Sequence, residues 1–170
     1  MPALTSPPPM TIRPATPEDC ELLIELIREL ADYERLGDEV TATGPILRQS
    51  LFGSNPAAMA IIAEVDTAVV GYALFYPTFS TFTGQAGLYL EDIYIRASWR
   101  NLGLGRQLFR HVARIAVDRG CPRLEWSVLD WNQPAIDFYQ RLGAEPLSDW
   151  LGRRLTGVAL KSAAGLTDDC

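Results

Sequence analysis

The stretch that decides the fold is LYLEDIYIRASWRNLGLGRQLF, residues 88–109. Its first half is rich in β-branched and aromatic residues, which predicts a strand over 87–95. Glu91 and Asp92 interrupt this apolar run, and buried carboxylates are costly unless they have partners. The pair therefore marks the strand as a candidate functional element.

The second half of the stretch has the pattern R-x-x-G-x-G, from Arg100 to Gly105, and leads into a helix predicted over 104–120. Glycines let backbone N–H groups approach an anion, and a helix N-terminus carries about half a positive charge. A Walker loop is excluded because no G-K-[ST] ending is present, and Leu108 replaces the third glycine of a dinucleotide fingerprint. A pyrophosphate fits the pattern, and a tight turn that needs glycine only for backbone geometry is the alternative.

The remaining elements follow from hydrophobic periodicity and turn signals. The polar pair Asp66-Thr67 between two strongly apolar runs indicates a hairpin. The order β-α-α-β-β-β-α-β-α-β predicts an α/β (α+β) fold, a mixed sheet with helices on its faces. The predicted strands lie at 11–13, 58–65, 68–76, 87–95, 123–128 and 153–160, the helices at 16–34, 45–52, 104–120 and 134–143, and a loop at 77–86.

Composition limits the class of protein. The 170 residues carry a net charge of −6, which disfavours nucleic acid as a partner and mildly favours cationic ligands. No apolar run is long enough for a membrane span, and the three dispersed cysteines indicate a reducing cytoplasm. No cluster has metal-ligand spacing. We expect one domain over 11–162 between a disordered proline-rich tail, 1–10, and a flexible tail, 163–170.

Two further motifs join the opening stretch: IRPATPEDC at 12–20 and DWNQPAIDFYQRLGA at 130–144. With LADYE at 30–34, they make the chain resemble the GNAT N-acetyltransferases, most closely the diamine (spermidine/spermine) N-acetyltransferase group with its thialysine-acetylating relatives. The similarity covers nearly the whole chain after the N-terminal tail. It implies the GNAT fold with a mixed, mostly antiparallel central sheet, acetyl-CoA as co-substrate, and a homodimer.

The resemblance also implies which residues hold the donor. One group lines the cofactor arm, a second holds the pyrophosphate, and a third touches the cofactor after the next strand. Many relatives have glycine where this chain has Asn101, and asparagine tolerates unusual backbone angles better than most residues. The implied cofactor-binding residues are Ile93, Tyr94, Ile95, Arg100, Asn101, Leu102, Gly103, Leu104, Gly105, Arg106, Asn132, Gln133, Pro134 and Ala135.

Acetyl transfer to an amine needs a neutral nitrogen and a proton for the leaving thiolate. An alkyl ammonium has a pKa of about 10.4, so its free base lies ~4.6 kcal/mol uphill at pH 7. The resemblance implies Tyr139 as the general acid, and an aromatic of the helix core is the alternative. We place Glu91 beside a water that relays the amine's proton, or against the distal ammonium of a diamine.

Adjacent strand residues point to opposite faces, so Glu91 and Asp92 can line one site only if a bulge intervenes, and a structural role for one of them is the alternative. The substrate-binding residues predicted with the help of the resemblance are Tyr33, Glu34, Glu91, Asp92, Glu125, Trp126 and Ser127.

These observations predict an enzyme that acetylates a primary amine of a small cationic substrate, such as a diamine, polyamine or thialysine-like compound, by direct transfer in a ternary complex. Leu151 stands where relatives place a substrate-contacting glutamate, which favours a shorter diamine or an amino-acid-like amine. The alternatives are acetylation of another amine, such as an amino acid or a protein N-terminus, and a non-catalytic acyl-CoA sensor. We expect no metal, nucleic acid or membrane partner.

Overall fold

The computed structural model describes residues 8–166. The chain divides into two compact units, one that ends at Leu129 and one that begins at Asp130. The first unit holds the whole sheet and three α-helices, and the second holds α4 and α5.

The first unit is built on one five-stranded sheet with the order β1-β2-β3-β4-β5. The first four strands pair antiparallel, and β5 pairs with β4 in parallel. The predicted mixed, mostly antiparallel sheet is therefore confirmed, as is the hairpin at 66–67 between β2 and β3. The strands are β1 (Met10–Pro14), β2 (Met59–Val65), β3 (Ala68–Ser80), β4 (Gln85–Ile95) and β5 (Leu124–Glu125).

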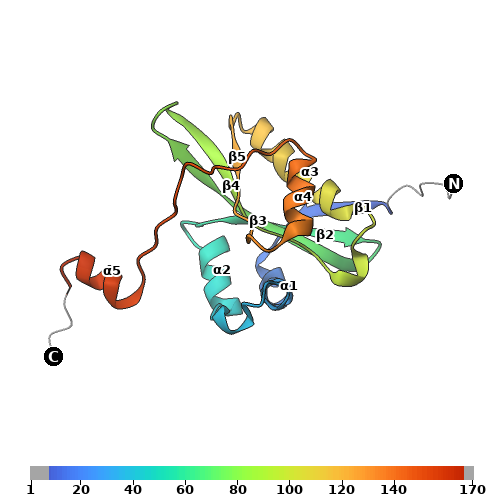
Figure 1. The fold of residues 1–170 in the computed structure, drawn as a ribbon. Helices are drawn as coiled ribbons and strands as arrows, with labels where there is room; N and C mark the ends of the chain where they lie inside the picture. Colours follow the sequence, from blue (N-terminus) through green and yellow to red (C-terminus); the bar gives the residue numbers. More distant parts are fainter. Residues whose placement is uncertain (1–7, 167–170) are drawn as a thin grey trace. The chain divides into compact units, whose positions relative to one another are not determined.

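Helices cover both faces of this sheet, as predicted. Figure 1 shows α1 (Cys20–Glu34) and α2 (Gly44–Phe52) on one side of the strands and α3 (Leu104–Asp118) on the other. Apolar residues at helical spacing bury one side of α1 and α2 against alternate residues of β2, β3 and β4. The buried residues of this layer are Leu23, Ile24, Leu26, Leu47, Leu51, Ala60, Ile62, Tyr72 and Tyr94.

The two layers are distinguished by neighbouring residues at the end of β4. Tyr94 packs in the layer of α1 and α2, whereas Ile95 points to the opposite face, as strand alternation requires. A Cβ added to Gly105 at the start of α3 would lie 3.8 Å from Ile95 Cγ1, so α3 covers that opposite face. Adjacent side chains at the end of β4 therefore point to opposite faces of the sheet. Tyr94 points to the face covered by α1 and α2, and Ile95 to the face covered by α3.

The predicted loop at 77–86 is wrong, because β3 continues to Ser80 and β4 begins at Gln85. Pro77 is the first residue of that predicted loop, and proline cannot donate a ladder hydrogen bond. In the structure β2 pairs with β3 only as far as Phe75, so Pro77 has β4 alone as its neighbour. On the side of β3 that faced β2, no strand lies beside Pro77, so the missing N–H costs no ladder hydrogen bond there.

The C-terminal predictions need two corrections. The strand predicted at 123–128 shrinks to the two residues of β5, and the strand predicted at 153–160 does not form. Instead, α5 (Gly157–Ala163) forms there, and all its residues are exposed. Its sequence GVALKSA holds several good helix formers, among them alanine, leucine and lysine. The predicted helix at 134–143 is confirmed as α4 (Gln133–Gln140).

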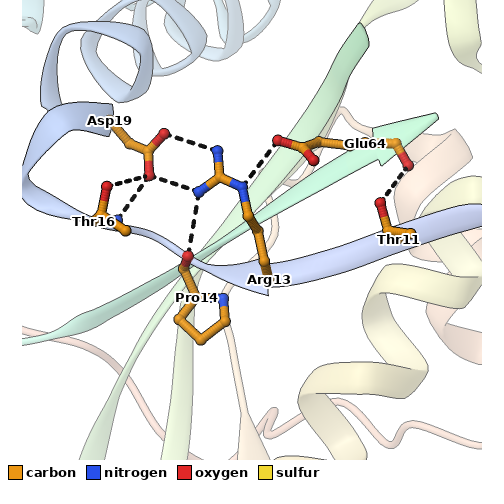
Figure 2. Close-up of polar contacts among 6 residues, drawn as sticks. All are labelled: Thr11, Arg13, Pro14, Thr16, Asp19 and Glu64. Atoms are coloured by element: carbon orange, nitrogen blue, oxygen red, sulfur yellow. Dashed lines mark hydrogen bonds and ion pairs between the residues drawn. The ribbon is translucent and has the colours of Figure 1, made fainter. Parts of the chain in front are cut away.

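An ion cluster fastens β1 to its neighbours, as Figure 2 shows. Arg13 donates to both carboxylate oxygens of Asp19, at 2.7 and 2.9 Å, and its Nε donates to Glu64 of β2 at 3.0 Å. The Thr16 N–H also donates to Asp19, at 2.7 Å, in the turn that precedes α1. The hydrogen bonds from Arg13 and Thr16 lower the pKa of Asp19 to about 2. We call Arg13, Asp19 and Glu64 the paired cluster.

The predicted tails fall largely outside the described residues. Of the N-terminal tail, 1–10, residues 1–7 are not described, and Met10 already begins β1. Of the C-terminal tail, 163–170, residues 167–170 are not described, and Ala163 ends α5. Within the part of the chain that is described, no helix is long and apolar enough to span a bilayer.

Candidate functional site

A β-bulge in β4 lies at the first predicted catalytic residue. Leu74 of β3 faces Asp92, and the next residue, Phe75, faces Leu90, so Glu91 has no partner across the ladder. One extra residue in a strand shifts the alternation of side chains by one position. The bulge that we required for Glu91 and Asp92 to share a face is therefore present.

Two tyrosines of β3 show that both carboxylates use the same face. Tyr72 donates from its hydroxyl to Asp92 at 2.9 Å, and Tyr76 donates to Glu91 at 3.2 Å. Residues 72 and 76 are four apart in β3, so they lie on one side of the strand. That side is the α1–α2 face, because Tyr72 belongs to its core.

Glu34, the last residue of α1, completes an acidic group on this face. Burial, and the charge of Asp92, raise the pKa of Glu34 above its ordinary value. Burial is also the main reason why the pKa of Asp92 is raised; Glu91 adds to the rise, and the Tyr72 hydrogen bond opposes it. Among the residues described, no arginine or lysine forms an ion pair with these three carboxylates. We call Glu34, Glu91 and Asp92 the unpaired cluster.

Aromatic contacts connect the unpaired cluster to one further predicted residue. The rings of Tyr76 and Tyr89 stack with centroids 5.2 Å apart, and the Tyr89 hydroxyl is hydrogen-bonded to Ser127 at 2.7 Å. Ser127 therefore joins the same chain of contacts as Glu91. Burial, and the nearby Glu91, raise the pKa of Tyr76 to about 12, so its hydroxyl keeps the proton that it donates.

The other two predicted residues of this segment are engaged elsewhere. Trp126 packs edge-to-face against Phe109 of α3, with centroids 5.2 Å apart. Glu125 forms an ion pair with Arg123 at 2.8 Å. The structure thus brings Glu34, Glu91, Asp92 and Ser127 together, whereas Trp126 belongs to the α3 layer.

Three further residues of this face were not predicted from the sequence: Tyr72, Tyr76 and Tyr89. Their signal is the repeated tyrosine in two strands that were both predicted. Which tyrosine faces which carboxylate depends on the register of β3 and β4, and that register changes at the bulge.

The glycine loop has the backbone geometry that an anion site requires. Asn101 and Gly103 both have positive φ, 64° and 78°, so asparagine adopts the left-handed conformation that we expected it to tolerate. The first intrahelical bond of α3 runs from the Gln107 N–H to Gly103 O. The preceding N–H groups of α3, at residues 104–106, therefore have no partner within the helix.

Gly105 tests whether the loop suits a pyrophosphate. A Cβ added there would meet only Ile95, at an ordinary contact distance, and Gly105 has no positive φ. Neither the packing of the chain nor its backbone therefore requires glycine at this position. Close approach of a ligand to the helix N-terminus would require it, so the residues present fit the group.

Arg100, which begins the loop pattern, directs its side chain toward α1. Its guanidinium carbon lies 4.3 Å from the centroid of the Tyr33 ring and 5.3 Å from that of Tyr94. Its Nε donates to the carbonyl oxygen of Ile95 at 3.0 Å. A predicted donor residue and a predicted substrate residue, Tyr33, are therefore in direct contact. Ile93 is half-buried in β4 opposite Ala73.

The second unit carries the remaining predicted residues. Asn132 is buried and caps α4, where its side-chain oxygen accepts from the Ala135 N–H at 3.4 Å. Pro134 occupies the first turn of α4, where its missing N–H costs nothing. Tyr139 is half-buried further along the helix, with its ring edge-to-face on Phe138. The roles of Tyr139 and of residues 132–135 remain predictions.

Comparison with known proteins identifies the family. Residues 23–144 match the model of the Acetyltransferase (GNAT) family. The thialysine N-epsilon-acetyltransferase of Bos taurus is 41% identical over 91% of this chain and 96% of its own length, and the L-ornithine N5-acetyltransferase NATA1 of Arabidopsis thaliana is 32% identical over 89% and 86%. An integron cassette protein of V. cholerae superposes with a TM-score of 0.77 at 27% identity, over 91% of this chain and 97% of that one. The match covers most of the sheet, the glycine loop and α4, and the chain accordingly belongs to the GNAT acetyltransferase family and is an N-acetyltransferase with the GNAT fold.

Proposed function

We propose that the protein transfers the acetyl group of acetyl-CoA to a primary amine of a small cationic substrate, by direct transfer in a ternary complex. The observation that carries the proposal is the unpaired cluster. Glu91 and Asp92 of β4 share one face of the sheet with Glu34 at the end of α1, and among the described residues no arginine or lysine forms an ion pair with them.

An ammonium group is the ligand that this arrangement favours. Burial disfavours the charged forms of Glu34 and Asp92, and their mutual repulsion adds to the cost. A bound cation offsets both the cost of burial and the repulsion between the carboxylates. An ammonium therefore stabilises these carboxylates more than it would stabilise solvated ones. A substrate with two amines would place one ammonium here and present the other nitrogen for reaction.

The donor is assigned to the loop that opens α3. The N–H groups of residues 104–106 and the exposed Arg106 suit the pyrophosphate, and the backbone near Ile93 would polarise the carbonyl. When bound, acetyl-CoA supplies an activated thioester. Residues 132–135 and the cofactor-arm residues Tyr94 and Ile95 complete the proposed donor set.

Two side chains of this protein handle protons in the proposal. Glu91, held by the Tyr76 hydroxyl, accepts the proton of the attacking ammonium through a water. Tyr139 donates its hydroxyl proton to the departing sulfur, since a tyrosine can hydrogen-bond to a thiolate and protonate it. No residue suggests an acetyl-enzyme intermediate, which favours direct transfer.

An amino-acid-like amine or a short diamine is the substrate class that we favour. Leu151 is exposed and carries no charge at the position where relatives place a glutamate for a longer substrate. The two relatives described above are named for thialysine and L-ornithine, which are both amino acids with a side-chain amine. The test is a panel of thialysine, ornithine, lysine, short diamines, spermidine and an N-terminal peptide, with release of free thiol from acetyl-CoA as the readout.

We expect thiol release with at least one amino-acid-like amine or diamine, and weaker release with spermidine. Tyr139→Phe should lower turnover about 10-fold or more while the Kd of CoA stays within about twofold. Tight CoA binding without thiol release for any amine would instead favour a non-catalytic acyl-CoA sensor, and release with the peptide alone would favour a protein N-terminus.

We further propose that residues 11–162 act as one catalytic domain in a cytoplasmic homodimer. The family match at 23–144 extends across both compact units, which supports a single domain. Light scattering on the purified chain tests the dimer, and a monomer at micromolar concentration would contradict it.

A further inference from the structure

One side of α1 faces the segment that follows β4. Glu25, Glu29 and Tyr33 recur at intervals of four, so they share a side of the helix. Arg96 pairs with Glu25 and, at 3.1 Å, with Glu29. Tyr33, the last of the three, lies against Arg100. Two arginines that follow β4 therefore hold the middle and the end of α1.

Arg100 is engaged by the protein itself on three sides. Its guanidinium lies within cation–π range of the rings of Tyr33 and Tyr94, and its Nε donates to the Ile95 carbonyl. The backbone of Arg100 is extended, and the chain turns at Asn101, which has positive φ. The side chain thus fixes the point where the chain turns into the donor loop, Asn101–Arg106.

The two ends of this contact belong to different parts of the proposed site. Arg100 directly precedes the donor loop, and Tyr33 directly precedes Glu34 of the unpaired cluster. We propose that Arg100 is a positioning residue, which holds the donor loop to the amine-binding end of α1 through Tyr33, and that its guanidinium does not serve as an ion-pair partner of the phosphate. The assignment of CoA to the donor loop and of the amine to the end of α1 rests on the proposed function.

Binding of CoA measured by calorimetry tests this proposal. Arg100→Lys keeps the charge but loses the planar stack and the Nε geometry, and Tyr33→Leu removes the ring. We expect each to raise the Kd of CoA about 3- to 30-fold, the range of a cation–π contact. The double variant Arg100→Lys/Tyr33→Leu should have a Kd of CoA no higher than that of the weaker-binding single variant, because the two substitutions break the same contact. Tyr33→Phe keeps the ring face and should restore the Kd to within about twofold.

A matched control uses Arg106, which is exposed in the first turn of α3. Arg106→Gln should raise the Kd of CoA, and its effect should add to that of Tyr33→Leu. The proposal is overturned if Tyr33→Leu binds CoA like the wild type. It is also overturned if Arg100→Lys binds normally while Arg100→Gln does not, because charge alone would then account for the role of Arg100.

Failure of the proposed function would look different. A wild-type protein that binds CoA but acetylates no amine contradicts the proposed reaction and leaves this inference standing. If the wild type binds no CoA, the Arg100–Tyr33 pair is tested by a double-mutant cycle on the unfolding free energy of the ligand-free protein. Additive effects in that cycle would overturn the contact itself. If the wild type does bind CoA, variants that lower only the melting temperature while the Kd of CoA is unchanged would reduce the contact to a structural role.

Discussion

The paired cluster and the unpaired cluster each combine helical and strand carboxylates beside the same sheet, with opposite effects on the pKa of the aspartate. In the paired cluster, Asp19 accepts two bonds from Arg13, and its pKa falls to about 2. In the unpaired cluster, Asp92 accepts from the Tyr72 hydroxyl, and burial raises its pKa. The comparison separates carboxylates that pair with an arginine from carboxylates that we propose bind the substrate ammonium.

The largest expected effect comes from the unpaired cluster. Glu91→Gln keeps an oxygen for the Tyr76 hydroxyl but removes the proton acceptor, so kcat/KM for the amine should fall about 100-fold. Because Glu91 is exposed, the unfolding free energy should stay within about 0.5 kcal/mol. Steady-state kinetics and urea denaturation measure the two quantities. The control is Asp118→Asn on α3, which removes an exposed carboxylate outside both clusters. If kcat/KM of Glu91→Gln stays within threefold of the wild type, Glu91 does not have the proposed role.

The same substitution in the paired cluster should act on stability instead. Asp19→Asn leaves Arg13 without its bidentate partner, and we expect a loss of about 2 kcal/mol in unfolding free energy. The kcat/KM of the folded variant should stay within about twofold of the wild type, since the cluster lies outside the proposed site. Glu64→Gln, which weakens only the single Nε bond, is the matched control and should cost less. A catalytic defect in folded Asp19→Asn would break the comparison.

Acid titration sharpens the comparison through Asp19. Its native pKa of about 2 lies below the ordinary value of 3.8, so the native state holds the carboxylate ionised when the unfolded chain has already bound a proton. The stabilisation is therefore complete above about pH 5 and is lost as the pH falls toward 2. Urea denaturation from pH 6 to pH 2 should show wild type and Asp19→Asn converging at the acid end. A stability difference that stays constant over this range would contradict the role of the ionised pair.

Sequence reasoning reached most of the fold because the decisive signals were local. The stretch at 88–109 contains an apolar strand, a glycine loop and an amphipathic helix, and each has its own pattern. The errors arose where pairing decides the outcome. Pro77 lies in a strand because it has β4 alone as its neighbour, and the segment 157–163 is helical where the sequence predicted a strand.

The site was predicted less completely for the same reason. The need for a bulge between Glu91 and Asp92 followed from strand alternation alone, but its tyrosine partners depend on a register that changes at that bulge. Likewise, the R-x-x-G-x-G pattern identified Arg100 but not the direction of its side chain, which is set by Tyr33 from a helix 67 residues earlier in the chain. Long-range contacts of this kind leave no local signal.

The smallest expected effect is a gain in stability from the unpaired cluster. Asp92→Asn keeps an oxygen that accepts from the Tyr72 hydroxyl but removes a buried charge beside Glu34, so unfolding free energy at pH 7 should rise by about 0.5–1 kcal/mol. The raised native pKa of Asp92 means that the wild-type penalty is absent below pH 3.8, grows as the pH rises, and is complete above the native value. This pH dependence is opposite in sign to that of Asp19. Binding of the amine should weaken in the same variant, and a variant that lost stability without losing amine affinity would show that Asp92 belongs with the structural carboxylates.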